Sequence, residues 1–139
     1  RCLMAVFTDN KYLRQLLGQC EWILALGTAA DYLGLANGGQ RNTVQIYVKK
    51  KQDVEGTEQI LVGSFEQIKY EMRCGLLCTT VNQTIVDLLE QDGDEQIITE
   101  SLANYYAESG NTFEGLTIPE YLKERFEKYS RWAKVYYEE

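Results

Sequence analysis

Histidine is absent from the sequence, and proline occurs once, at Pro119. Histidine is the side chain whose ordinary pKa lies nearest neutrality, and it is the usual base beside a nucleophilic serine or cysteine. Its absence excludes the Ser-His, Cys-His and His-metal sites of the common hydrolases. Phosphate-binding segments of the forms GxxxxGK[ST] and GxGxxG are absent too. The sequence therefore predicts a protein that is not an enzyme and has no cofactor.

Long hydrophobic runs are also missing. The most apolar stretch, residues 22–36, is interrupted by Asp31, whereas a membrane-spanning helix needs roughly 18 or more predominantly apolar residues in succession. We therefore expect a soluble protein that does not act in a membrane.

Cysteine is sparse: a chain of 139 residues that is 45% hydrophobic has only Cys2, Cys20, Cys74 and Cys78. Such a chain can bury a core without disulfide bonds, so we expect free thiols in the core and a reducing, cytoplasmic compartment. The four residues include no Cys-x-x-Cys pair of the kind that binds zinc on a turn. We therefore predict no metal site.

The longest pattern in the chain is the helical spacing of apolar residues over residues 63–90. Ser64 and Gln67 form a Ser-x-x-Gln capping box at its start, and Asp92-Gly93 is a turn signal just beyond its end. The pattern predicts one long central helix, around which the rest of a single domain, residues 1–139, would pack.

The other segments predict three more helices and one β-hairpin. One helix begins at Thr8 or Asp9 and ends near Gly34, another covers residues 95–109, and the last begins at the Thr117–Glu120 capping box. Alternating residues in 44–48 and 58–62, around a turn at 53–56, predict the hairpin. We predict a mainly α fold, a bundle of about four helices with the hairpin between the first and central helices. An α+β fold is the second choice.

Residues 90–101 resemble an EF-hand calcium loop, with acidic residues at its first, third and fifth positions and Ile97 at its eighth. The resemblance implies calcium ligands in this turn. Two positions depart from the motif: Glu95 replaces the glycine of the sharp turn, and Ser101 replaces the closing glutamate. We therefore interpret the segment as a polar turn between helices.

Lysine and arginine are absent from residues 74–122, which hold nine acidic side chains. A stretch of one sign attracts basic partners and repels nucleic acid and anionic membranes. Its densest part is a cluster of Asp87, Glu90, Asp92, Asp94 and Glu95. We predict that this cluster binds a protein with a basic surface, in a non-enzymatic interaction or regulatory domain. The apolar second half of the first helix and the lone hairpin predict self-association as well, as a dimer.

Two other functions stay open. Basic residues gather near the predicted hairpin tip: Arg41, Lys49, Lys50 and Lys51. Such a tip is one way in which a regulator contacts the phosphates of nucleic acid. The adjacent pairs Tyr105-Tyr106 and Tyr136-Tyr137 cannot both face one core, so they add to the prediction of self-association. The third function is a small-molecule or lipid sensor with an aromatic pocket between helices.

Overall fold

A five-stranded mixed β-sheet is the centre of the fold. The computed structural model describes residues 21–37, 43–91 and 94–138. The strands are β1 (Trp22–Leu24), β2 (Val44–Val48), β3 (Thr57–Leu61), β4 (Tyr70–Arg73) and β5 (Leu76–Thr79), in the spatial order β3-β2-β1-β5-β4. β1 runs antiparallel to β2 and parallel to β5, and β4 runs antiparallel to β5. β3 and β4 are therefore the two edges of the sheet.

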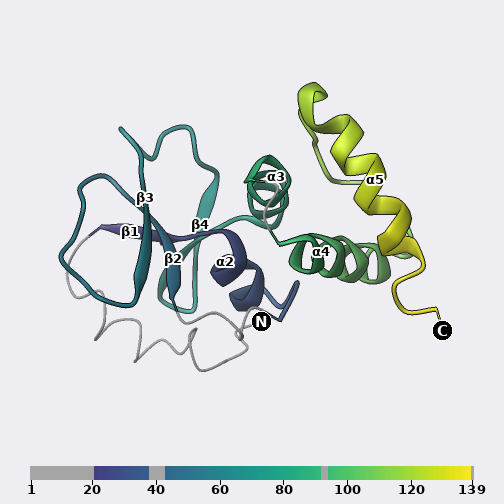
Figure 1. The fold of residues 1–139 in the computed structure, drawn as a ribbon, viewed down its shortest axis with the longest axis horizontal. Helices are drawn as coiled ribbons and strands as arrows, with labels where there is room; N and C mark the ends of the chain where they lie inside the picture. Colours follow the sequence, from purple (N-terminus) through teal and green to yellow (C-terminus); the bar gives the residue numbers. More distant parts are fainter. Residues whose placement is uncertain (1–20, 38–42, 92–93, 139) are drawn as a thin grey trace.

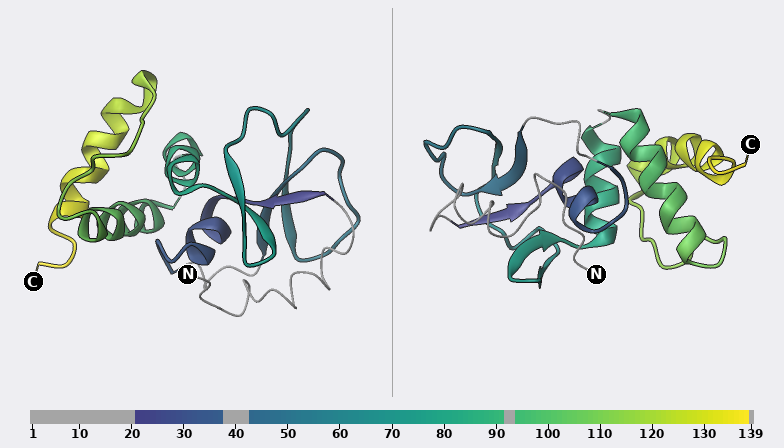
Figure 2. Two further views of the ribbon diagram at one scale, coloured as in Figure 1. Left: turned by 180° about the vertical axis from the view of Figure 1, so that it is seen from behind. Right: turned by 90° about the horizontal axis from the view of Figure 1, so that it is seen from below.

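The helices extend the molecule away from the sheet. They are α2 (Leu26–Tyr32), α3 (Val81–Gln91), α4 (Glu95–Glu108), the 3₁₀ turn η2 (Glu120–Leu122) and α5 (Lys123–Lys134). α2 and α3 lie between the sheet and α4, and α5 packs on α4 at the far end (Figures 1 and 2). The fold is α+β, so the prediction of a mainly α, four-helix bundle is wrong.

The predicted central helix over residues 63–90 is wrong in its first half. Residues 70–79 form the β4–β5 hairpin, and only Val81–Gln91 is helical. The hairpin closes through Cys74 and Gly75, whose φ angles are +52° and +85°. Positive φ at both central residues gives a two-residue turn the twist that joins antiparallel strands. Ser64 caps no helix, and its hydroxyl instead accepts a bond from the amide of Glu66 in a local turn.

The predicted hairpin of residues 44–62 is also wrong, because β2 and β3 are parallel. Val44 lies opposite Thr57 and Val48 opposite Leu61. Residues 49–56 cross back along the sheet, so that the amide of Val44 donates to the carbonyl of Gly56 at 2.8 Å. Two hydrogen bonds between Gln52 and Gln59, at 2.7 and 2.9 Å, hold this connection against β3.

The remaining predicted helices have mixed outcomes. The helix of residues 95–109 is confirmed as α4, and the last helix is confirmed as α5, although η2 precedes it and no side chain caps it. The first predicted helix is wrong at residues 22–24, which form β1, but its last part is confirmed as the short α2 (Leu26–Tyr32). Its earlier part lies outside the described residues.

Both faces of the sheet are buried at its centre. One core cluster joins Ile23 and Tyr47 of the sheet to the four α-helices. The other gathers side chains from the opposite face together with two residues of α2: Trp22, Leu24, Val44, Ile46, Val48, Leu76, Cys78, Ala29 and Tyr32. The sheet loses this cover toward β4, where residues 70–72 are exposed.

Candidate interaction site at the edge strand β4

The backbone of β4 turns alternate residues toward the open edge of the sheet. The amide of Thr80 donates to the carbonyl of Lys69 at 3.0 Å, which makes these two residues a hydrogen-bonded pair. In an antiparallel ladder such pairs alternate, so the backbone N–H and C=O groups of Glu71 and Arg73 also point toward β5. The N–H and C=O groups of Tyr70 and Met72 therefore point away from β5. No strand pairs with this side of β4 in the described part of the chain.

The side chains of Tyr70 and Met72 stay exposed on one face of the sheet. Their exposed fractions are 41% and 64%. Met72 lies opposite Leu77, and the next residues across the sheet are Ile23 and Tyr47. Because directly opposite residues share a face, this row runs from the buried centre to the open edge. The apolar face of the core thus continues into solvent at β4.

A groove of about 880 Å³ lies beside this edge. Its lining is Glu21, Trp22, Lys49, Ser64, Phe65, Glu66, Ile68, Tyr70, Met72, Gly75, Leu76 and Leu77. Most of these side chains are apolar or aromatic, and three are charged, namely Glu21, Lys49 and Glu66. That combination is typical of a site that receives an apolar side chain and orients it through a few polar groups.

Interactions within the chain fix one wall of the groove. The Lys49 ammonium lies 2.8 Å from the Glu21 carboxylate and 4.9 Å from the centre of the Phe65 ring. The hydrogen bond and the charge of Glu21 raise the pKa of Lys49. Phe65 in turn meets Tyr70 edge to face, with 6.2 Å between ring centres. Lys49 is therefore part of the groove wall.

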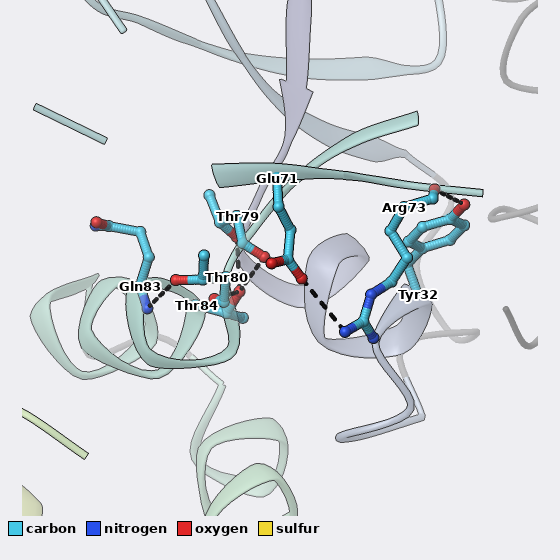
Figure 3. A network of polar contacts seen from close by, with 7 residues as sticks. All are labelled: Tyr32, Glu71, Arg73, Thr79, Thr80, Gln83 and Thr84. Carbon is cyan, nitrogen blue, oxygen red and sulfur yellow. Dashed lines mark hydrogen bonds and ion pairs between the residues drawn. The ribbon is translucent and has the colours of Figure 1, made fainter. Parts of the chain in front are cut away.

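Polar contacts hold the β4–β5 hairpin to α2 and α3. The Tyr32 hydroxyl donates to the carbonyl of Arg73 at 2.7 Å, and the Arg73 guanidinium lies 3.3 Å from the Glu71 carboxylate (Figure 3). At the start of α3, the amide of Gln83 donates to the hydroxyl of Thr80 at 3.1 Å. The side chain of the same glutamine accepts from the amide of Lys69 at 3.0 Å. The edge is thus presented on a fixed support.

Asp87, the first member of the predicted acidic cluster, is buried with 8% exposure. It accepts hydrogen bonds from the Tyr47 hydroxyl at 2.7 Å and from the Gln83 amide at 2.8 Å. Burial raises the pKa of Asp87, and these two bonds lower it in part. Burial of the Tyr47 hydroxyl and the nearby charge of Asp87 raise the pKa of Tyr47. Asp87 therefore joins α3 to the sheet.

The other acidic residues also have contacts within the chain. Glu90 accepts from the Tyr121 hydroxyl at 2.7 Å. Asp94 caps α4 by accepting from the amides of Gln96 and Ile97. Glu95 lies 3.6 Å from the Lys128 ammonium. Asp92 lies outside the described residues, as does part of the segment that resembles a calcium loop. The described members of the cluster are divided among four local roles and do not converge on one free surface.

The basic residues of the nucleic-acid alternative do not form a hairpin tip. Arg41 lies outside the described residues, and Lys49 pairs with Glu21. Lys50 and Lys51 are exposed in the connection that crosses back from β2 to β3.

The aromatic residues between α4 and α5 pack on one another. The rings of Tyr106 and Phe113 lie 4.8 Å apart, and those of Phe113 and Phe126 lie 5.3 Å apart. The Tyr105 hydroxyl donates to the carbonyl of Glu114 at 2.6 Å. These rings therefore contact one another between α4 and α5, and the side chain of Tyr105 is tied to the following loop.

The cysteines depart in part from the expectation of free thiols. Cys78 is free and buried, and burial raises the pKa of its thiol to about 12. Cys74 is disulfide-bonded, and its partner is not among the described residues. The expectation is therefore wrong for Cys74.

Sequence reasoning did not identify Tyr70, Met72, Trp22 or Phe65 as site residues. The available signal was the Cys74-Gly75 turn between two short runs rich in apolar residues, which permits a hairpin as well as a helix.

No family model, no curated protein and no solved structure matches the chain. Within the described residues, no helix has the length and apolar character that crossing a bilayer requires.

Proposed function

We propose that the chain is a non-enzymatic protein-interaction domain that binds an extended segment of a partner protein along β4. The observation that carries the proposal is the outer edge of β4, which pairs with no strand among the described residues and has Tyr70 and Met72 exposed beside the groove. An added strand would satisfy the outward N–H and C=O groups of these two residues. Main-chain hydrogen bonds give affinity in this mode of recognition, and pockets for alternate side chains give specificity.

The two faces of β4 define the chemistry of the added segment. On the groove face, the segment would lie beside Met72, Tyr70 and the aromatic walls, which favour apolar side chains. On the other face it would lie beside Glu71 and Arg73, which favour charged side chains of the opposite sign. The partner segment would therefore alternate apolar and charged residues.

The expected affinity is modest. Complete burial of a methionine side chain is worth about 1.5–3 kcal/mol, and Met72 already loses part of its exposure to its own chain. A short strand adds a few main-chain hydrogen bonds, each worth about 0.5–1.5 kcal/mol net. The sum of these two contributions, reduced by the cost of ordering the segment, is typical of regulatory contacts with micromolar dissociation constants.

For the compartment, we propose the cytoplasm on the basis of the free Cys78 thiol. The disulfide at Cys74 argues in the opposite direction, because disulfides persist mainly in oxidising compartments. The redox state of Cys74 in freshly isolated protein decides between the two. A reduced Cys74 thiol supports the cytoplasm, and a complete disulfide contradicts it.

A peptide selection with matched proline variants tests the interaction proposal. Twelve-residue peptides selected on the full chain should slow amide hydrogen exchange at Tyr70 and Met72. Met72→Pro removes one outward N–H without removing a bond to β5, and it should abolish binding of the selected peptides.

The control is Leu61→Pro, at an outward-facing position of the other edge strand. The amide of Val62 donates to Val48, so Leu61 faces away from β2. Leu61→Pro should leave peptide binding unchanged. Peptides that bind equally well to both proline variants, or that protect other amides, would contradict the proposal.

A further inference from the structure

We infer that the segment added to β4 is β4 of a second copy of this chain, antiparallel to the first, with Met72 opposite Met72 of the second copy. This inference rests on the proposed function, namely that β4 accepts a strand. It goes further by naming the partner and the register. Two edges that meet in this way form a symmetric dimer with one continuous sheet.

The backbone permits few registers of this kind. A symmetric pair keeps each face of the sheet continuous only where residues of the same face lie opposite each other. Met72 opposite itself satisfies this condition, and its outward N–H and C=O groups then bond to those of its counterpart. Glu71 then lies opposite Arg73 of the second copy. All three of these positions lie within β4.

The charges of β4 select this register over its neighbours. A shift that places Glu71 opposite itself brings two carboxylates together, and a shift that centres on Arg73 brings two guanidinium groups together. Like charges directly opposite destabilise a sheet, whereas opposite charges stabilise it. With Met72 at the centre, Glu71 and Arg73 form two attractive cross-strand pairs related by symmetry. A shift centred on Tyr70 would draw in Ile68 and Lys69, which lie outside the strand.

The same register also covers the exposed side chain of Met72, whereas Tyr70 lies opposite Cys74 in the turn of the second copy. Met72 of each copy would lie beside its counterpart on the groove face, next to Leu77 and above the groove. The four residues of β4 are a short edge, and charged residues on short edges also protect monomers from unwanted pairing. Charges of either sign at positions 71 and 73 would protect the edge from unwanted pairing. The dimer instead needs opposite charges at these two positions, because they face each other across the two copies. This difference makes the inference testable.

Two charge reversals provide the test. Glu71→Arg places arginine opposite arginine in a homodimer, and Arg73→Glu places glutamate opposite glutamate. Each variant alone should dimerise at least tenfold more weakly than the unchanged chain in sedimentation equilibrium at 10–200 μM. An equal mixture of the two variants restores both opposite-charge pairs, and should form heterodimers as strongly as the unchanged chain forms homodimers. Thermal melts check that both variants fold.

The outcomes separate this inference from the proposed function. A monomer throughout that range, or a mixture that associates no better than its components, would overturn the inference. If selected peptides still protect Tyr70 and Met72 in that case, the edge binds a different partner and the proposed function stands. If no peptide protects these residues and the chain dimerises regardless of charge at 71 and 73, both proposals fail.

Discussion

Replacing Tyr47 with phenylalanine should destabilise the fold at neutral pH by removing one hydrogen bond from a buried carboxylate. Asp87 is buried, and within the described part of the chain its carboxylate accepts from the Tyr47 hydroxyl at 2.7 Å and from the Gln83 side-chain amide at 2.8 Å. Phenylalanine keeps the ring and its packing but leaves one carboxylate oxygen without its donor. A hydrogen bond to a charged group is worth about 1.5–3 kcal/mol. We expect Tyr47→Phe to lower the free energy of unfolding by that amount, and Tm by about 5–10 °C.

The raised pKa of Asp87 determines how the cost of Tyr47→Phe changes with pH. The pKa of Asp87 in the folded protein is raised above its ordinary value of 3.8. A carboxyl group with a raised pKa binds protons more tightly in the folded state, so its contribution to stability falls as pH rises from 3.8 through the folded pKa. Loss of the Tyr47 hydroxyl raises that pKa further. The cost of Tyr47→Phe should therefore be full at pH 7 and should shrink as pH falls toward 4.

The matched control is Tyr121→Phe, which removes a hydroxyl from an exposed carboxylate. The Tyr121 hydroxyl donates to Glu90 at the same distance of 2.7 Å, but Tyr121 is 70% exposed and water can replace it. We expect a cost below about 0.5 kcal/mol for this surface change. Urea titrations of both variants at pH 7 and pH 4 measure the difference. Equal costs for the two variants, or a Tyr47→Phe cost independent of pH, would refute the reasoning.

Two further substitutions test the support of α4. Asp94→Ala removes the side chain that caps α4 and should cost about 1 kcal/mol in urea unfolding, while Asp94→Asn keeps an acceptor and should cost less. Gly115→Ala should lower Tm measurably, because Gly115 has φ of +97° and an added Cβ would meet the Tyr105 hydroxyl at 2.6 Å. Gly63→Ala, where no atom lies within 4 Å, is its control and should change Tm little.

Local signals predicted the second half of the chain better than the first. Turn signals such as Gly110 after α4 and Pro119 before η2 and α5 act within a few residues, so the sequence alone locates both helices, although no side chain of the predicted Thr117–Glu120 box caps the last one. Residues 63–79 carry apolar side chains at spacings that suit a helix and also a short hairpin. The choice depends on Cys74 and Gly75 adopting positive φ and on β5 pairing with the distant β1, and neither is encoded by local spacing.

The parallel pairing of β2 and β3 also cannot be predicted from local sequence patterns. Parallel neighbours usually need a crossover of a dozen or more residues, and here residues 49–56 suffice. The candidate site depends on that topology, because strand order decides which residues stand at an edge. The residues that flank Met72 in the sequence do not indicate whether its strand lies at the centre or at the edge of the sheet. Its exposure follows only from the order β3-β2-β1-β5-β4.

The two edges of the sheet differ in what strand addition would gain. The outward residues of β3 are Thr57, Gln59 and Leu61, and only the last is apolar and exposed. β4 instead presents Tyr70 and Met72 beside the groove. Its loop is anchored by Phe65 in the core, and α3 holds the amide of Lys69. An edge that is already ordered loses little entropy on binding, so more of its contact energy appears as affinity. We therefore expect association at β4 in preference to β3.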